Sequence, residues 1–157
     1  MLFSKKELNF EVPKVMGIIN LTPDSFSDGG KFICPKTFKT DRSKVLKEIE
    51  EMENQGAAFI DIGAESTRPN AFQISAAEEL DRLMPILDDI KNINAVVSID
   101  SSKGEVISEA IKNGVDFIND INSLKDKKAL KLVKDPTRPV CIRHKENNLS
   151  NHSICLE

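Results

Sequence analysis

Short apolar runs alternate along the chain with longer stretches in which apolar residues recur every three or four positions. The short runs are rich in Val and Ile and are bounded by turn-forming residues, a pattern typical of strands buried on both faces. We therefore predict strands over residues 15–19, 58–62, 96–99, 117–118 and 139–142.

The stretches between these strands have helical spacing. They predict helices over about 43–55, from 75, from 102, and over about 126–134. The second and third helices open on Ser75–Glu78 and Ser102–Glu105, both of which fit a capping box. Gly56 stands where a helix commonly ends in glycine, and Pro85 predicts a kink.

Strands that alternate with helices in this way predict a parallel sheet with right-handed crossovers, an α/β fold. Polar residues end all five predicted strands, at a position where α/β folds place their chemistry. These residues are Asn20, Asp61, Asp100, Asn119 and His144. The chain has neither a GxGxxG nor a GxxxxGK[ST] motif, which favours a barrel over a dinucleotide-binding sheet. Five strands are nevertheless too few for an eight-stranded barrel, which typically takes ~250 residues.

Composition narrows the range of partners. The net charge of −3 gives no electrostatic reason to expect nucleic acid or an anionic membrane, and the absence of Trp and Tyr removes the usual platforms for base stacking. The first ten residues, "MLFSKKELNF", do not form the apolar segment of a signal peptide. Three cysteines without a CxxC motif favour reduced thiols in a cytoplasmic protein.

Four stretches carry a family resemblance. They are "GIINLTPDSFSDGG" (17–30), "IDIGAESTRPNA" (60–71), "VSIDSSKGEV" (97–106) and "FINDINSL" (117–124). Together they resemble the signature motifs of dihydropteroate synthases, a pterin-binding family with the (β/α)8 TIM-barrel fold. The resemblance runs from about residue 15 to residue 144 and corresponds to the first five βα units of that barrel.

The resemblance implies an enzyme of folate biosynthesis. Such a transferase condenses 6-hydroxymethyl-7,8-dihydropterin pyrophosphate with p-aminobenzoate to give dihydropteroate and pyrophosphate. It also implies Mg²⁺ as cofactor, a cytoplasmic location, two small-molecule substrates and a tendency toward homodimers.

Five residues match the family's functional positions, and a sixth is assigned by its place in the chain. Asn20 matches the metal position beside the pyrophosphate, and Thr67 and Arg68 match positions near the pyrophosphate and p-aminobenzoate. The pterin-binding positions are matched by Asp100 and Asn119, and Ile121 by its place lines the face of the pterin ring. Asp100 is in addition the expected catalytic residue, because its carboxylate favours positive charge on the dihydropterin as pyrophosphate leaves.

Three of these residues have a purely structural alternative. A strand-ending Asn such as Asn20 can cap a turn, and Arg68 can form a surface ion pair with Glu65 or Asp61. Asp100 can cap the following helix, although Ser101 or Ser102 could fill that role instead.

The chain departs from the family pattern in two ways. Arg143 stands where the family usually has an apolar residue of the pterin pocket, although His144 matches. The motifs of the family's sixth to eighth strands, which carry an Asp, a Lys and an Arg-His pair, are absent. We expect residues 1–145 to be the amino-terminal portion of a pterin-binding barrel and 146–157 to be a disordered polar tail.

Several alternatives remain open at this point. The chain is either a fragment of the enzyme or a half-barrel that pairs with another chain. It could also be an inactive remnant that binds pterin weakly, or an interaction module. Another pterin-binding barrel, such as a corrinoid-dependent methyltransferase domain, fits less well, because the "TPDSFSDGG" loop suits a pyrophosphate substrate.

Overall fold

The computed structural model describes residues 1–4, 6–23, 30–66, 71–134 and 138–142. Two short strands, β1 (Leu2–Phe3) and β2 (Lys6–Glu7), open the chain. Strands and helices then alternate: β3 (Val15–Asn20), α1 (Arg42–Asn54), β4 (Ala57–Gly63), α2 (Ala76–Leu87), the 3₁₀ turn η1 (Ile90–Asn92), β5 (Val96–Asp100), α3 (Gly104–Lys112), β6 (Phe117–Asp120), α4 (Lys127–Leu132) and β7 (Val140–Ile142).

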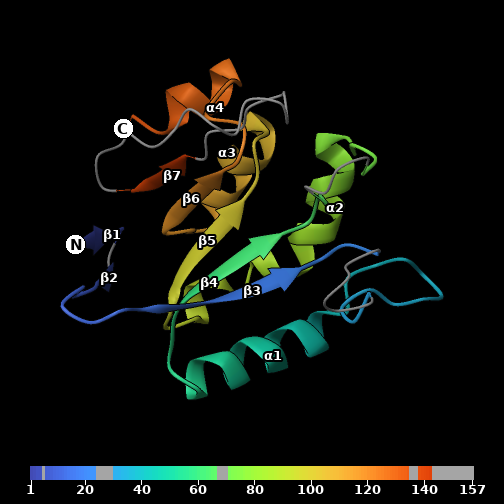
Figure 1. Cartoon of the computed structure of the whole chain (residues 1–157). Coiled ribbons are helices and arrows are strands. Elements are labelled where there is room, and N and C mark those ends of the chain that lie inside the picture. The colour runs from blue at the N-terminus through green and yellow to red at the C-terminus, as the bar shows by residue number, and fades with distance from the viewer. Residues whose placement is uncertain (5, 24–29, 67–70, 135–137, 143–157) are drawn as a thin grey trace, which may run out of the picture.

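The five longer segments predicted as strands form one parallel sheet in the order β3-β4-β5-β6-β7 (Figure 1). Each strand therefore lies beside the next one along the chain, with a helix between them, as in the wall of a barrel. This confirms the predicted order of elements and the α/β class.

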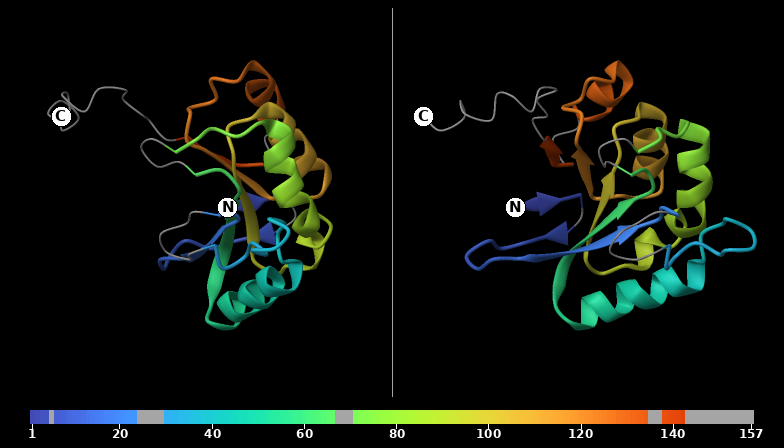
Figure 2. Two further views of the ribbon diagram at one scale, coloured as in Figure 1. Left: turned by 90° about the vertical axis from the view of Figure 1, so that its right-hand side faces the viewer. Right: turned by 45° about the vertical axis from the view of Figure 1, so that its right-hand side comes forward.

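All four helices lie on one side of the curved sheet (Figure 2). The strand residues that face the helices are aliphatic and join the main core; they include Ile19, Ile62, Ile99 and Ile118. Their neighbours along each strand point to the opposite, concave face, because successive side chains of a strand alternate. The sheet thus has an apolar outer face beneath the helices and a separate inner face.

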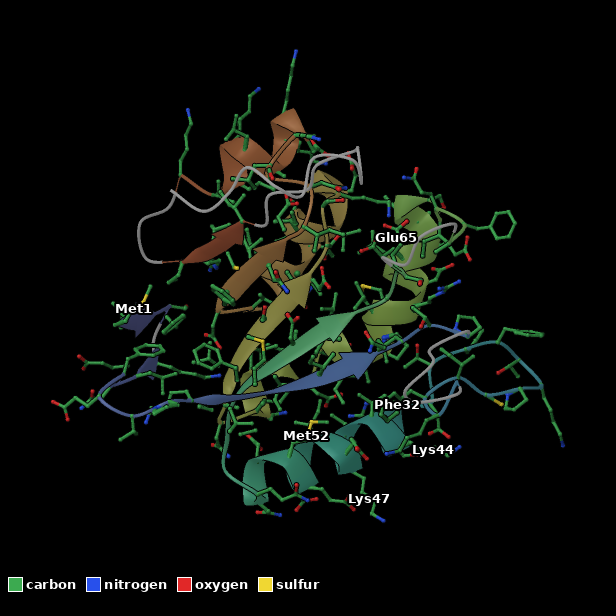
Figure 3. All side chains as sticks on the ribbon, in the orientation of Figure 1. Met1, Phe32, Lys44, Lys47, Met52 and Glu65 are labelled. Carbon is green, nitrogen blue, oxygen red and sulfur yellow. The ribbon has the colours of Figure 1, made fainter. Side chains whose placement is uncertain are left out.

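The side chain of Met52 on α1 packs directly against Gly17 of β3. A Cβ atom on Gly17 would lie 2.5 Å from the sulfur of Met52, which Figure 3 shows between α1 and the strands. The glycine of the "MGII" strand is therefore explained by packing.

The N-terminal caps of the helices agree with the prediction at α2 and differ from it at α3. Ser75 caps α2 as predicted, since its Oγ accepts the N–H of Glu78 at 3.1 Å. The capping box predicted at Ser102 is wrong: α3 begins at Gly104, and its N-cap residue Lys103 makes no capping bond through its side chain. Asp126 serves instead, because its Oδ2 accepts the N–H of Gly104 at 2.9 Å while its Oδ1 caps α4.

The first strand of the sheet is not buried on both faces, contrary to the prediction. Val15 and Ile18 of β3 are 65% and 56% exposed, and Ile142 of β7 at the other edge is 52% exposed. Within the described ranges, no helix is long and apolar enough to cross a membrane.

The pair β1–β2, which the sequence pattern did not predict, covers the amino ends of the strands. Phe3 packs edge-to-face on Phe59 and Phe117, with ring centroids 5.2 and 5.8 Å apart. Lys6 donates through Nζ to the carbonyl oxygens of Ile93 and Ala95 and to Asp116. These contacts close the amino end of the inner face with a small aromatic core of its own.

Candidate functional site

The carboxyl ends of the strands bring the predicted site residues into one row. In the register of the sheet, Asn20 pairs with Gly63, Gly63 with Asp100, and Asp100 with Asn119. Residues in register on neighbouring parallel strands lie about 4.8 Å apart and point to the same face. Asn20, Asp100 and Asn119, which are far apart in sequence, therefore share the concave face at its carboxyl edge.

Gly63 keeps this row open. A Cβ atom at this position would lie 3.4 Å from the Cβ of Asp100, so the missing side chain leaves space beside the Asp100 carboxylate. Asp100 is half-buried, which suits a carboxylate that meets a ligand from one side.

Asp61 joins the row through Asn119. The Nδ2 of Asn119 donates to Oδ2 of Asp61 at 2.9 Å, across the intervening strand β5. Asp61 is only 5% exposed, and its Oδ1 has no hydrogen-bond partner among the described residues. A buried carboxylate oxygen of this kind is available to a donor from a ligand. The sequence placed Asp61 at a strand end without giving it a binding role; only the contact with Asn119 reveals its place.

The turn after β6 is held in an unusual conformation. Ser123 and Leu124 both have positive φ angles, 57° and 55°, which cost energy for residues other than glycine. The carboxylate of Asp120 accepts the backbone N–H groups of Asn122 and Leu124 at 2.7 and 3.2 Å. Burial raises the pKa of Asp120, although these two bonds oppose the shift. The buried carboxylate of Asp120 therefore holds the turn in this conformation.

The loop of the first signature is closed at its base. Gly30 has φ 73°, and a Cβ there would lie 2.9 Å from the carbonyl oxygen of Pro23. The two ends of the loop therefore approach so closely that only glycine fits at residue 30. Residues 24–29 between them lie outside the described part of the chain.

The remaining predicted residues divide into two groups. Ile121 is half-buried and directly follows β6, next to Asn119 and Asp120. Thr67, Arg68, Arg143 and His144 lie outside the described residues, so their predicted roles stay predictions. The two carboxylates weighed as partners of Arg68 have other contacts: Asp61 accepts from Asn119, and Glu65 pairs with Lys103.

The described residues contain no group of three or more His, Cys, Asp or Glu side chains that could hold a metal ion. Within these residues a magnesium ion could be held by few protein oxygens, such as the amide oxygen of Asn20, together with oxygens of a bound phosphate. This donor set fits magnesium, which commonly takes one or two protein ligands and completes its shell with substrate phosphates and water.

Comparison with known proteins identifies the class to which this fold and site belong. Residues 16–154 match the family model of pterin binding enzymes, and the chain belongs to this family.

Its relatives within the family include dihydropteroate synthases. The chain is 46% identical over 142 residues to the dihydropteroate synthase of Haemophilus influenzae, covering 90% of this chain and 49% of the relative. Among solved structures it resembles the Yersinia pestis dihydropteroate synthase with a sulfonamide drug, with TM-score 0.84, 38% identity and coverage of 94% and 52%. The Burkholderia cenocepacia enzyme complexed with 7,8-dihydropteroate gives TM-score 0.76 at 34% identity, with 92% and 46% covered.

The chain spans about half the length of the relatives it matches. The five parallel strands and their helices thus correspond to part of a TIM barrel, as the sequence predicted.

Proposed function

We propose that this chain carries the amino-terminal half of a dihydropteroate synthase site, in which dihydropterin pyrophosphate and p-aminobenzoate are condensed to dihydropteroate. The observation that carries the proposal is the row Asn20–Gly63–Asp100–Asn119 across four adjacent strands on the concave face. The similarity to dihydropteroate synthases over nearly the whole chain supports it.

In this proposal the carboxylate of Asp100 and the amide of Asn119 hold the pterin. The ring presents an amino-pyrimidinone edge with both donors and acceptors, which a carboxylate and an amide can match. Asp61 fixes the orientation of the Asn119 amide, because the bond from Nδ2 to Asp61 leaves Oδ1 of Asn119 to accept from the ligand. Ile121 packs against the face of the ring.

The reaction exchanges one bond for another at the methylene carbon of the pterin. The C–O bond to pyrophosphate breaks, the electron pair leaves with pyrophosphate, the amine of p-aminobenzoate forms the new C–N bond, and the amine releases a proton. Asp100 assists because a nearby carboxylate stabilises positive charge that develops on the dihydropterin. No covalent intermediate with the protein is required.

The leaving group needs positive charge and hydrogen-bond donors. We assign Arg68 and Thr67 to the pyrophosphate and p-aminobenzoate, since the guanidinium of arginine matches phosphate oxygens in pairs. Asn20 would hold magnesium, which would neutralise part of the negative charge of the pyrophosphate. The resemblance adds a cytoplasmic location and a homodimer to the proposal.

An assay with two polypeptides tests the proposal. The chain is mixed with the part of the Haemophilus influenzae relative that it does not match, and formation of dihydropteroate is followed with and without Asp100→Ala. We expect product from the mixture and a loss of at least about a hundredfold with Asp100→Ala, in line with the removal of one charge-stabilising group. Asp81→Asn, on the exposed side of α2, is the matched control and should leave the rate unchanged.

The alternatives give different results in the same experiment. An inactive remnant would bind dihydropterin without forming product in the mixture, and a half-barrel interaction module would do neither. Absence of product from the mixture would overturn the proposed function, whether or not dihydropterin binds.

A further inference from the structure

Two buried polar side chains lie on the concave face, one layer below the row of site residues. Asp61 and Ser98 pair in register on the neighbouring strands β4 and β5. The residues before and after each of them belong to the main core beneath the helices, so both side chains point to the concave face. Asp61 is 5% exposed and Ser98 is fully buried.

Each of these side chains has an atom that lacks a hydrogen bond. Within the part of the chain that the structure describes, neither Oδ1 of Asp61 nor Oγ of Ser98 has a partner, whereas Oδ2 of Asp61 accepts from Asn119. An unpartnered buried oxygen costs free energy, and native proteins usually satisfy it with a protein group or an ordered water molecule. Two such atoms at one pair of positions therefore point to a shared hydrogen-bonding partner.

The surroundings of the pair indicate the side from which this partner is shared with a ligand. The neighbours of the pair along and below the layer are apolar: Ile18, Phe59, Val96 and Phe117. Toward the carboxyl edge, the next residue on the same face of β4 is Gly63, which has no side chain to cover Asp61. Polar groups that could share the partner therefore lie above the pair, where the proposed ligand binds.

Distance decides between the ligand itself and a bridging water molecule. Two residues of a strand span about 6.6 Å, so the pair lies about that far below Asp100 and Asn119. A direct hydrogen bond covers only about 2.7–3.2 Å between heavy atoms, whereas two bonds through one water molecule cover about 5.5–6 Å. The carboxylate oxygen, the hydroxyl and one ligand atom give such a water three hydrogen bonds, the usual number for a buried water molecule.

We propose that Asp61 and Ser98 hold one water molecule beneath the dihydropterin, and that Ser98 is a positioning residue that acts on the ligand through this water. The carboxylate of Asp61 only accepts, so the water donates one O–H to its Oδ1 and accepts the hydroxyl proton of Ser98. The second O–H of the water then points to an acceptor atom of the ring. The inference rests on the proposed function for the identity of the ligand, but the water site itself does not.

A high-resolution crystal structure of the 157-residue chain tests the water site without any ligand. We expect a water molecule within about 3.2 Å of both Oδ1 of Asp61 and Oγ of Ser98, and we expect Ser98→Ala to lose it. A map that shows other buried waters but none between these two atoms would overturn the proposal. With dihydropterin bound, a ring atom in direct contact with Oδ1 of Asp61 would overturn it as well.

Thermal melting of the ligand-free chain shows whether the hydroxyl of Ser98 has a partner. Ser98→Ala should lower the melting temperature by about 2–4 °C, because it removes a hydrogen bond to the water. If the hydroxyl has no partner, the same change removes an unsatisfied buried group, and melting stays unchanged or rises. That result would overturn the proposal. Ser43→Ala, on the exposed side of α1, is the matched control and should melt like the wild type.

Ligand binding separates positioning from stability. Ser98→Ala should weaken binding of the dihydropterin about fivefold and change binding of p-aminobenzoate less than about twofold, because only the pterin contacts the water. Ser43→Ala should change neither affinity. Unchanged dihydropterin affinity, or equal weakening of both ligands, would contradict the positioning role. A wild-type chain that binds no dihydropterin would overturn the pterin assignment of the proposed function, while the crystal structure and the melting would still decide whether the water site exists.

Discussion

At the amino ends of β4, β5 and β6 the concave face is apolar and carries Phe59, Val96 and Phe117. At the carboxyl ends the same face carries amide and carboxylate groups. Phe59 and Phe117 meet Phe3 of the amino-terminal strand pair at one end. Asp100 and Asn119 stand in register at the other. The same strands therefore serve two purposes, and the two ends should respond differently to substitution.

The two ends of the sheet therefore differ in role: contacts at the amino end stabilise the fold, and groups at the carboxyl end are available for binding. At the amino end, Phe3, Phe59 and Val96 form a buried apolar cluster, and the Nζ of Lys6 donates to the buried carboxylate of Asp116. At the carboxyl end, Asp61 and Glu79 each keep a buried oxygen without a hydrogen-bond partner among the described residues. Groups that are left unsatisfied in a fold are a common mark of a binding site.

The largest effect should come from the amino end. Phe3→Ala removes a ring that is 2% exposed, and we expect a loss of about 3–5 kcal/mol in the free energy of unfolding. Phe10→Ala is the matched control, because Phe10 belongs to the same cluster but is 50% exposed. Urea denaturation of the two variants measures the difference; equal losses would mean that the strand pair does not close this end of the sheet.

A smaller loss is expected where α3 meets α4. Gly104→Ala would place a Cβ atom 2.6 Å from the Cβ of Lys128 and 2.8 Å from the backbone nitrogen of Ala129. Since backbone cannot move aside easily, we expect about 1–3 kcal/mol of destabilisation. A thermal melt of the variant measures it, and a melting temperature equal to that of the wild type would refute this close packing.

The shared cap at Asp126 should give an effect that depends on pH. Its carboxylate accepts N–H groups at the start of both α3 and α4, and the bond from Gly104 is the main cause that lowers the pKa of Asp126. A lowered pKa means that its contribution is present above the unfolded pKa and is lost as the pH falls below about 4.

We therefore expect Asp126→Ala to cost about 1 kcal/mol at pH 7 and less in acid. Asp126→Asn can still cap, so it should lose less stability at pH 7 and should no longer show the acid-dependent part. Unfolding at pH 7 and pH 3 provides the comparison, and a cost of Asp126→Ala that stays constant between the two would contradict this role.

Gly63→Ala should have the smallest effect on stability and a clear effect on the site. The added methyl group would stand 3.4 Å from the Cβ of Asp100, an approach that the strands can accommodate within about 1 kcal/mol. It would crowd the space beside the carboxylate, so dihydropterin affinity should fall about tenfold. Calorimetric titration measures the affinity for dihydropterin, and a thermal melt measures the stability. An unchanged affinity would show that Gly63 does not line the pocket.

Much of this architecture could be predicted from the sequence. The helical spacing and the β-branched runs placed all five strands of the sheet and all four helices, because each element buries one continuous apolar face. The row of Asn20, Asp100 and Asn119 followed from the same pattern, since parallel strands end at one edge.

Other features depend on contacts between residues distant in the sequence. The strand pair β1–β2 has only two residues in each strand, and Phe3 becomes part of a core only when it meets Phe59 and Phe117. The cap of α3 comes from Asp126, 22 residues beyond Gly104, so no local motif could have revealed it. The contact between Asp61 and Asn119 likewise spans 58 residues.

The most direct test of the account is the affinity of the purified chain for the dihydropterin with and without the Asp100 carboxylate. Asp100→Asn keeps the size of the side chain but removes its charge, and Asp81→Asn makes the same change on the exposed surface of α2. We predict that Asp100→Asn lowers the affinity about tenfold or more while Asp81→Asn leaves it unchanged, both with native-like melting. Equal affinities for the wild type and Asp100→Asn would show that the row at the carboxyl ends is not the pterin site.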